Sequence, residues 1–220
     1  MRPFTFLVLY IGTLVCIAQG QVLINEVDAD QSGPDRTEFV ELYDGGVGGT
    51  SLDGLVLVFF NGSNDSSYRV VDLRGQVTGP SGFFIIGNPG VPSVGLELNP
   101  GNSGAIQNGP DAIALYTGTV DDFPNATPVT DANLVDALVY GTNDSDDFEL
   151  LTPGELQVND SPSESMSRIP DGGDPRQAST YEAKVPTPGF ANVVVDSLSV
   201  ELSVESIAEN VGPGSLTVIV

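Results

Sequence analysis

The sequence predicts an all-β protein, a β-sandwich built from two sheets. Its 220 residues include 26 glycines and 16 prolines, and no long stretch has the periodicity of an amphipathic helix. This composition is typical of short strands joined by tight turns. Short apolar or alternating runs recur along the chain, each followed by Gly, Asn, Asp or Pro, and their number fits a two-sheet sandwich. The runs are 22–27, 38–43, 55–60, 68–73, 82–86, 111–116, 134–140 and 166–169.

The apolar pattern predicts where each strand lies. Run 38–42 alternates glutamate with apolar residues, which is typical of a half-buried strand. Runs 55–60 and 83–86 are continuously apolar, as expected of strands that are covered on both faces. We expect these two strands to be central in their sheets.

The first 20 residues have the features of a secretory signal peptide. Arg2 is followed by an apolar run at 4–17, and small residues precede a cleavage point after Gly20. The run is shorter than the roughly 20 residues that a membrane span needs. Cys16 lies inside this segment, so the mature chain from Gln21 has no cysteine. We predict a secreted or cell-surface protein without a transmembrane segment after cleavage.

The sequence pattern changes after residue 192. Residues 21–192 form one predicted domain, while 193–220 read as a linker and the start of a second β module. Leu198, Val200, Leu202 and Val204 alternate strictly with polar residues. The last residues form an apolar strand-like run without a partner, so we expect the chain to be a fragment of a larger protein.

The charge of the chain restricts its partners. Thirty Asp and Glu residues oppose 7 Lys and Arg residues, which gives a formal net charge of −23. The only lysine is Lys184. Such a surface repels phosphate backbones, so direct nucleic-acid binding is not expected. The predicted partner is a protein or a component of an extracellular matrix or cell surface, whose identity the sequence leaves open.

Most catalytic chemistries are excluded by composition. The chain has no histidine, and the mature chain has no cysteine. Ser-His-Asp and Cys-His catalysis and conventional zinc sites need an imidazole or a thiolate. Carboxylate chemistry remains, but no Asp-Thr-Gly or Asp-Ser-Gly signature selects a pair. We therefore predict no catalytic residue and no enzyme activity for the residues present.

One segment resembles the first half of a calcium loop. Asp28, Asp30 and Ser32 place oxygen atoms at positions 1, 3 and 5, and glycine follows at position 6. The second half departs from the pattern, because Phe39 stands where a bidentate glutamate belongs. Asp35, Glu38 and Glu41 are candidate replacements. Calcium is thus the one cofactor we consider, and the alternative is a β-turn whose aspartates bind local backbone.

Several asparagines begin Asn-x-Ser/Thr sequons in predicted loops. Asn61, Asn64, Asn125 and Asn143 are candidate glycosylation sites in a eukaryotic host, whereas Pro162 weakens a fifth sequon at Asn159. The acidic run 143–147 is a second candidate calcium loop, with a solvated acidic turn as its alternative.

Residues 22–192 resemble a lamin-tail domain of the kind found in secreted bacterial and invertebrate proteins. The resemblance implies an immunoglobulin-like β-sandwich that acts as an interaction module. Residues after 192 are similar to the opening of a Calx-β or related immunoglobulin-like repeat. The matching motifs, in chain order, are Ile24-Asn25-Glu26, the run 38–42, Leu52-Asp53-Gly54-Leu55, and the runs 82–87, 109–115, 134–140, 165–168 and 187–192.

Structural roles account for the polar residues in these motifs. We expect Asn25 and Glu26 to order a strand end, and Asp111 and Asp136 to accept backbone N–H groups where strands begin. Gly54 and Gly189 are expected to supply turns.

The leading functional hypothesis is a secreted, non-catalytic interaction or spacer module of a larger extracellular or surface protein. An alternative is an accessory domain of a secreted nuclease or phosphatase whose catalytic domain follows Val220. A third hypothesis, an acidic mineral-associated protein, depends on charge alone.

Overall fold

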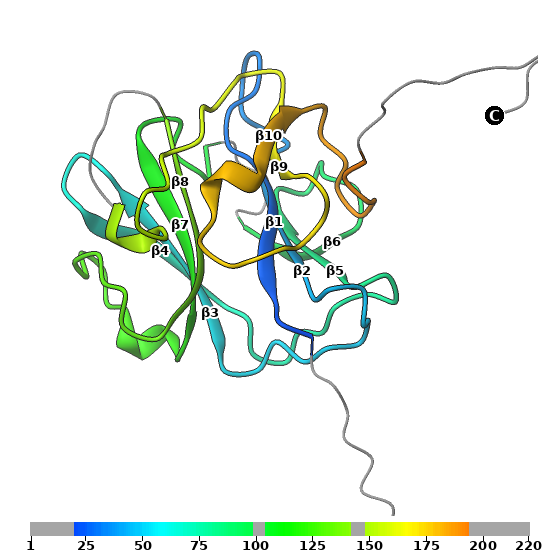
Figure 1. The fold of residues 1–220 in the computed structure, drawn as a ribbon, viewed down its shortest axis with the longest axis horizontal. Coiled ribbons are helices and arrows are strands. Elements are labelled where there is room, and N and C mark those ends of the chain that lie inside the picture. The colour runs from blue at the N-terminus through cyan, green and yellow to red at the C-terminus, as the bar shows by residue number, and fades with distance from the viewer. Residues whose placement is uncertain (1–19, 99–103, 142–147, 194–220) are drawn as a thin grey trace, which may run out of the picture.

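The computed structural model describes residues 20–98, 104–141 and 148–193 and shows the predicted all-β fold, a sandwich of two sheets (Figure 1). The predicted signal peptide at 1–19 and second module at 194–220 lie outside the described residues. Within the described ranges no helix is long and apolar enough to cross a membrane.

The larger sheet has six strands in the order β10-β9-β1-β2-β5-β6. Its strands pair antiparallel except β5 and β6, which are parallel. Their bounds are β1 Leu23–Asp28, β2 Phe39–Tyr43, β5 Phe83–Gly87, β6 Val94–Glu97, β9 Ser165–Arg168 and β10 Tyr181–Lys184.

The smaller sheet has four antiparallel strands in the order β4-β3-β7-β8. Short 3-10 turns lie in the connections. The bounds are β3 Leu55–Asn61, β4 Ser66–Asp72, β7 Asp111–Thr117, β8 Leu134–Tyr140, η1 Val120–Asp122, η2 Phe148–Leu150 and η3 Ala178–Thr180.

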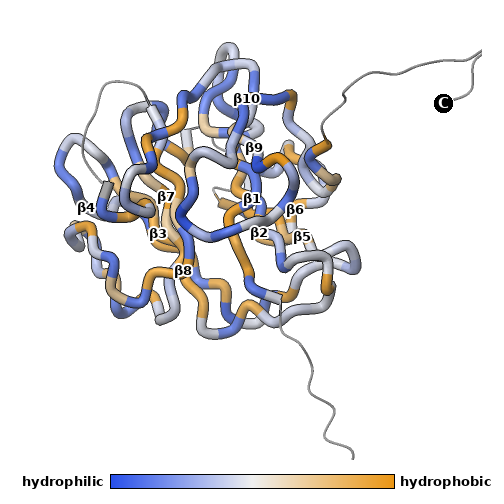
Figure 2. The backbone as a smooth tube through the Cα atoms, in the orientation of Figure 1, coloured by the Kyte–Doolittle hydropathy of each residue, from blue (hydrophilic) through white to orange (hydrophobic). Residues whose placement is uncertain are grey.

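The main core lies between the two sheets. Alternate residues of each strand point inward, so Val40 and Leu42 of β2 meet Leu57 and Phe59 of β3 in one buried cluster. Apolar segments accordingly follow the strands of both layers in Figure 2. Burial of these side chains is the main favourable term in folding.

A second cluster covers the outer face of the four-stranded sheet. Phe60 of β3 and Tyr116 of β7 contact Phe123 and Leu150, which the connections fold over the strands. β3 is therefore buried on both faces and is interior to its sheet, as its continuous apolar run predicted.

A buried ion pair joins the two sheets. The guanidinium of Arg168 in β9 donates to both carboxylate oxygens of Asp136 in β8 at 3.0 and 2.9 Å, and both side chains are fully buried. Asp136 also accepts the backbone N–H groups of Ile24 and Arg176, which confirms its expected role. The Arg168 guanidinium lies 4.7 Å from the ring centre of Tyr181. Each polar group of this pair thus has partners in the fold.

Candidate binding face

Two buried carboxylates lie side by side on the outer face of the six-stranded sheet. Glu26 of β1 and Glu41 of β2 are register partners, and both are fully buried. Glutamate is rarely buried unless its charge is compensated or its oxygens are hydrogen-bonded. The residues that cover these two side chains must therefore supply hydrogen-bond donors to them.

The cover is the segment 185–193, which we call the strap. The backbone N–H and hydroxyl of Thr187 donate to the Glu26 carboxylate at 2.9 and 3.1 Å. The N–H of Gly189 donates to Oε2 of Glu41 at 2.7 Å. Gly189 has φ of +86°, in the left-handed region that favours glycine, so it supplies the expected turn. The two glutamates thus bind successive parts of the strap.

The end of the strap is bound through Asp171. Its Oδ1 accepts the backbone N–H of Asn192 at 3.0 Å and the side-chain amide of Asn25 at 2.9 Å. The Asn25 amide also donates to Oε1 of Glu41 at 3.0 Å, and its oxygen accepts the N–H of Gly172. Asn25 therefore joins the carboxylates of Glu41 and Asp171 from within β1, whereas the sequence predicted it at a strand end.

Burial sets the ionisation of the two glutamates. Desolvation raises the pKa of Glu41 to about 8, although hydrogen bonds from Gly189 and Asn25 oppose the shift. Desolvation likewise raises the pKa of Glu26 against hydrogen bonds from Ser165 and Thr187. Because their oxygens bind the strap and are closed off from solvent, these carboxylates hold structure in place.

The strap presents apolar side chains outward. Val185, Phe190 and Val193 are 74%, 71% and 62% exposed. Single exposed apolar residues are ordinary, but this short segment carries three of them. The strap thus combines an anchored backbone with an apolar surface.

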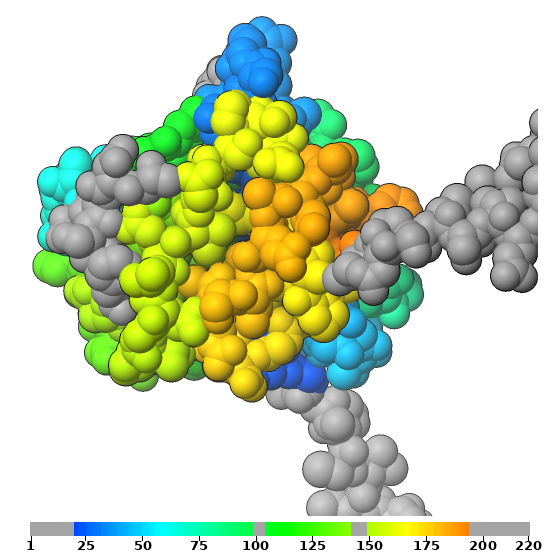
Figure 3. Space-filling view, turned by 45° about the horizontal axis from the view of Figure 1, so that its top comes forward, coloured from blue at the N-terminus to red at the C-terminus, as the bar shows by residue number. Residues whose placement is uncertain are grey.

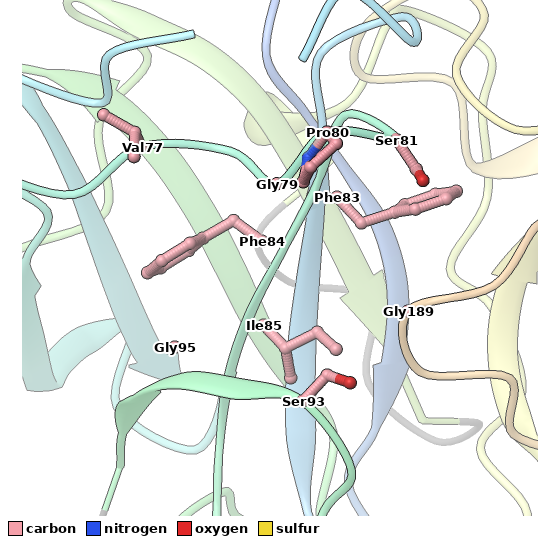
Figure 4. Close-up of a pocket in the computed structure, with 10 residues that line it drawn as sticks. All are labelled: Val77, Gly79, Pro80, Ser81, Phe83, Phe84, Ile85, Ser93, Gly95 and Gly189. Atoms are coloured by element: carbon pink, nitrogen blue, oxygen red, sulfur yellow. The ribbon is translucent and has the colours of Figure 1, made fainter. Parts of the chain in front are cut away.

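A groove of about 350 Å³ lies along β5 and is lined by β5, the segments 77–81 and 93–95, and Gly189 of the strap (Figure 4). Phe83, Ile85, Ser93 and Gly189 contribute to its walls. Phe83 stacks on Tyr43 with ring centres 4.7 Å apart, which limits the positions of its ring. Among the described residues, no charged side chain lines the groove, so its chemistry suits apolar or uncharged groups.

The structure brings part of the predicted calcium loop together. Asp30 and Asp35 accept hydrogen bonds from the same side-chain amide of Asn108, at 3.0 and 3.1 Å. Asp28, at the end of β1, accepts from the amide of Gln31 at 2.8 Å. Burial raises the pKa of Asp28 to about 7, and the charge of Asp160 adds to the shift. Asp30 and Asp35 therefore share one amide donor, while Asp28 is bound by a different amide.

Ser32 lies apart from that arrangement, because its hydroxyl donates to the carbonyl of Pro162 at 3.3 Å. In the part of the chain that the structure describes, no group of three or more His, Cys, Asp or Glu side chains is placed to hold a metal ion. Calcium binding stays a prediction. The second candidate loop, 143–147, lies outside the described residues.

The sequons differ in their surroundings. Asn64 and Asn125 are exposed. Asn61 is partly buried, and its amide nitrogen, the atom that carries a glycan, donates to Gln107 at 2.6 Å. Asn143 lies outside the described residues. Glycosylation therefore has the clearest access at Asn64 and Asn125.

Comparison with known proteins assigns no family to the chain. The chain is similar to a crystal structure of a DUF4876 family protein from Bacteroides thetaiotaomicron, with 13% identity and a TM-score of 0.44, covering 83% of this chain and 73% of that chain. No family model matches the chain, and no curated protein matches its sequence.

The sequence motifs included the strap and the glutamates Glu26 and Glu41, but did not predict that these segments bind one another. Asp171 and the exposed Phe190 were not predicted as members of a site. The available signal was the pair Glu26 and Glu41 in otherwise apolar strands, because a carboxylate in a buried strand requires hydrogen-bond donors from elsewhere in the chain.

Proposed function

We propose that this chain is a secreted, non-catalytic interaction module of the lamin-tail type, part of a larger extracellular or surface protein, and that it contacts a partner protein through the strap. The signal-peptide pattern supports secretion, and the ordered motifs of 22–192 support the lamin-tail assignment.

The observation that carries the proposal is Phe190, a 71% exposed aromatic residue on a segment whose neighbouring N–H groups are bound by the buried carboxylate of Glu41 and the partly buried carboxylate of Asp171. Aromatic residues are enriched among the few interface residues that contribute most to affinity. An aromatic ring on a fixed backbone loses little conformational entropy on binding. The anchored strap thus has the properties of a preformed contact surface.

The groove beside the strap defines the chemistry of the contact. Most of its lining is apolar, including Phe83, Phe84 and Ile85, and no charged side chain of the described residues contributes to it. Although the chain carries a net charge of −23, this face suits an apolar segment of a partner protein.

The test is site-specific photo-cross-linking. A photoreactive phenylalanine analogue is placed at Phe190 in the mature chain, and at Val120 in η1 as the control. Val120 is 36% exposed and lies beside β4 of the other sheet. Each protein is irradiated with the extracellular fraction of the source organism. We expect a discrete cross-linked protein from position 190 alone.

Competition makes the result specific. Unlabelled wild-type protein should suppress the cross-link, whereas a Phe190→Ser variant should require at least about tenfold more protein, since loss of an interface anchor typically costs about 2 kcal/mol or more. Equal cross-linking at positions 190 and 120, or equal competition by wild type and variant, would contradict the proposal.

A further inference from the structure

β10 forms one end of the six-stranded sheet and pairs only with β9 among the described strands. The N–H of Ile169 donates to the carbonyl of Thr180 at 3.0 Å. Residues that bond to the neighbouring strand alternate along an antiparallel ladder. Tyr181 and Ala183 therefore direct their main-chain groups away from β9, to the open edge.

One of those outward groups is already bound. The N–H of Tyr181 donates to the carbonyl of Ala178, which ends η3. The N–H and carbonyl of Ala183 remain directed along the edge, and Ala183 is exposed. A strand edge with such groups is a template for another strand.

The side chains of this edge are self-complementary in charge. Glu182 and Lys184 lie on the same face of β10, two residues apart, with side chains 55% and 42% exposed and an ion pair at 2.8 Å. Lys184 is the only lysine of a chain that has 30 acidic residues. When two β10 strands run antiparallel about a twofold axis at Ala183, Glu182 of each copy lies opposite Lys184 of the other.

We propose that β10 pairs with β10 of a second copy of this chain and joins two six-stranded sheets into one continuous sheet. The two Ala183 residues exchange N–H to carbonyl hydrogen bonds at the centre, and two Glu182–Lys184 contacts flank them. A twofold axis perpendicular to the sheet keeps each residue on the same face as its partner, so this register satisfies the alternation of side chains.

The surface beside this strand edge also suits a second copy of the chain. A groove of about 450 Å³ separates β10 from the segment 154–159, which lies next to it in the sandwich (Figure 3). Leu156 in this groove is 73% exposed. The neighbouring copy approaches from this side and covers Leu156. The strap begins directly after β10, but Phe190 and the groove by β5 are not part of the paired edge, so the pairing goes beyond the proposed function and does not depend on it.

Sedimentation equilibrium of the mature chain over a range of concentrations tests this pairing. The measurement is made at physiological salt, where charges are screened over about 8 Å. We expect a reversible monomer–dimer equilibrium. Glu182→Lys or Lys184→Glu alone brings like charges together twice and should weaken dimerisation by about tenfold or more. The double reversal restores opposite charges and should restore the wild-type dimerisation constant.

Two further variants separate pairing from misfolding. Glu97→Lys makes the same charge change on β6, the other end strand of this sheet, and should leave dimerisation unchanged. Ala183→Pro removes the outward N–H and should abolish the dimer, while edge strands tolerate proline at such positions. A monomer at all concentrations overturns the proposal. So does a dimer that the single reversals do not weaken, or that the double reversal does not restore.

Discussion

Replacing Asp136 by asparagine should be among the most destabilising polar substitutions in this domain. Asp136 and Arg168 are fully buried, and the carboxylate accepts two hydrogen bonds from the guanidinium and the N–H groups of Ile24 and Arg176, at distances of 2.6 to 3.0 Å. The asparagine side chain would keep the shape of the aspartate but remove its negative charge. Arg168 would remain buried as an uncompensated cation.

Removing one partner of a buried ion pair costs about 3 to 5 kcal/mol. The control is Asp72→Asn, which removes the partner of Arg74 in a pair whose side chains are 38% and 81% exposed. Exposed pairs contribute only about 0 to 1 kcal/mol. We therefore expect Asp136→Asn to lower the free energy of unfolding several times more than Asp72→Asn.

Guanidinium chloride unfolding of the mature chain, followed by far-ultraviolet circular dichroism, measures both variants. The midpoint should fall sharply for Asp136→Asn, with little change in the slope. A loss for Asp136→Asn no larger than that for Asp72→Asn would refute the reasoning, because it would mean that Arg168 is not held as an isolated buried charge.

Three further predictions concern ionisation, packing and metal binding. Burial raises the pKa of Glu41 to about 8 and that of Asp28 to about 7, so the folded state binds these protons more tightly than the unfolded chain. The resulting stabilisation is complete below the ordinary carboxyl pKa and is lost as pH rises through about 7 to 8. Thermal melting should therefore occur at a lower temperature at about pH 9 than at about pH 5, and Glu41→Gln should make the melting temperature less dependent on pH. The same pH dependence in wild type and Glu41→Gln would contradict the assignment. Leu138→Ala should lower the free energy of unfolding in urea by about 2 to 5 kcal/mol, because Leu138 is fully buried in the main core. The control Val47→Ala, at a half-exposed residue, should change it by no more than about 0.5 kcal/mol. Similar losses for both variants would count against the core assignment. If calcium binds at Asp28 and Asp30, calorimetry on residues 21–192 will show heat with millimolar calcium, and the double variant Asp28→Asn, Asp30→Asn will remove that heat. If no heat appears and a chelator leaves the melting temperature unchanged, the calcium hypothesis is wrong.

The strands were predictable where pattern and burial agree. Each of the eight predicted runs overlaps a strand of the structure, and the apolar runs at 55–60 and 83–86 occupy interior positions of their sheets. β6 and β10 were not predicted. Val94–Glu97 and Tyr181–Lys184 each contain four residues, with exposed positions among them. They are extended because a neighbouring strand, β5 for β6 and β9 for β10, offers main-chain hydrogen bonds. No local sequence pattern shows that such a neighbour is present.

The burial of polar residues was the less predictable part. The alternation at 38–42 indicated a half-buried strand, yet Phe39–Leu42 is buried on both faces. Glu41 is covered by the strap, which is distant in sequence. Glu38 is also buried, because its carboxylate accepts the N–H groups of Ala105 and Ile106 at 2.7 and 2.9 Å. Alternation shows that a strand has two faces, but the chain segments that later cover a face leave no signal within the strand itself.

Roles that depend on backbone contacts were predicted more closely. Asp111 was expected to accept a backbone N–H near a strand end, and it accepts that of Gly62 at 3.0 Å. The pairing of Asp136 with Arg168 had no comparable signal, because the two residues lie on different strands and meet only when the sheets pack.

The central claim is that buried carboxylates fix the strap so that Phe190 is presented on an ordered backbone. Amide hydrogen exchange of Thr187 and Gly189 in the mature chain measures this directly, because their N–H groups donate to Glu26 and Glu41. The account predicts strong protection of both amides, with Glu41→Ala releasing Gly189 more than Thr187. Exchange of both amides in the wild type at the rate of an unstructured chain would contradict it.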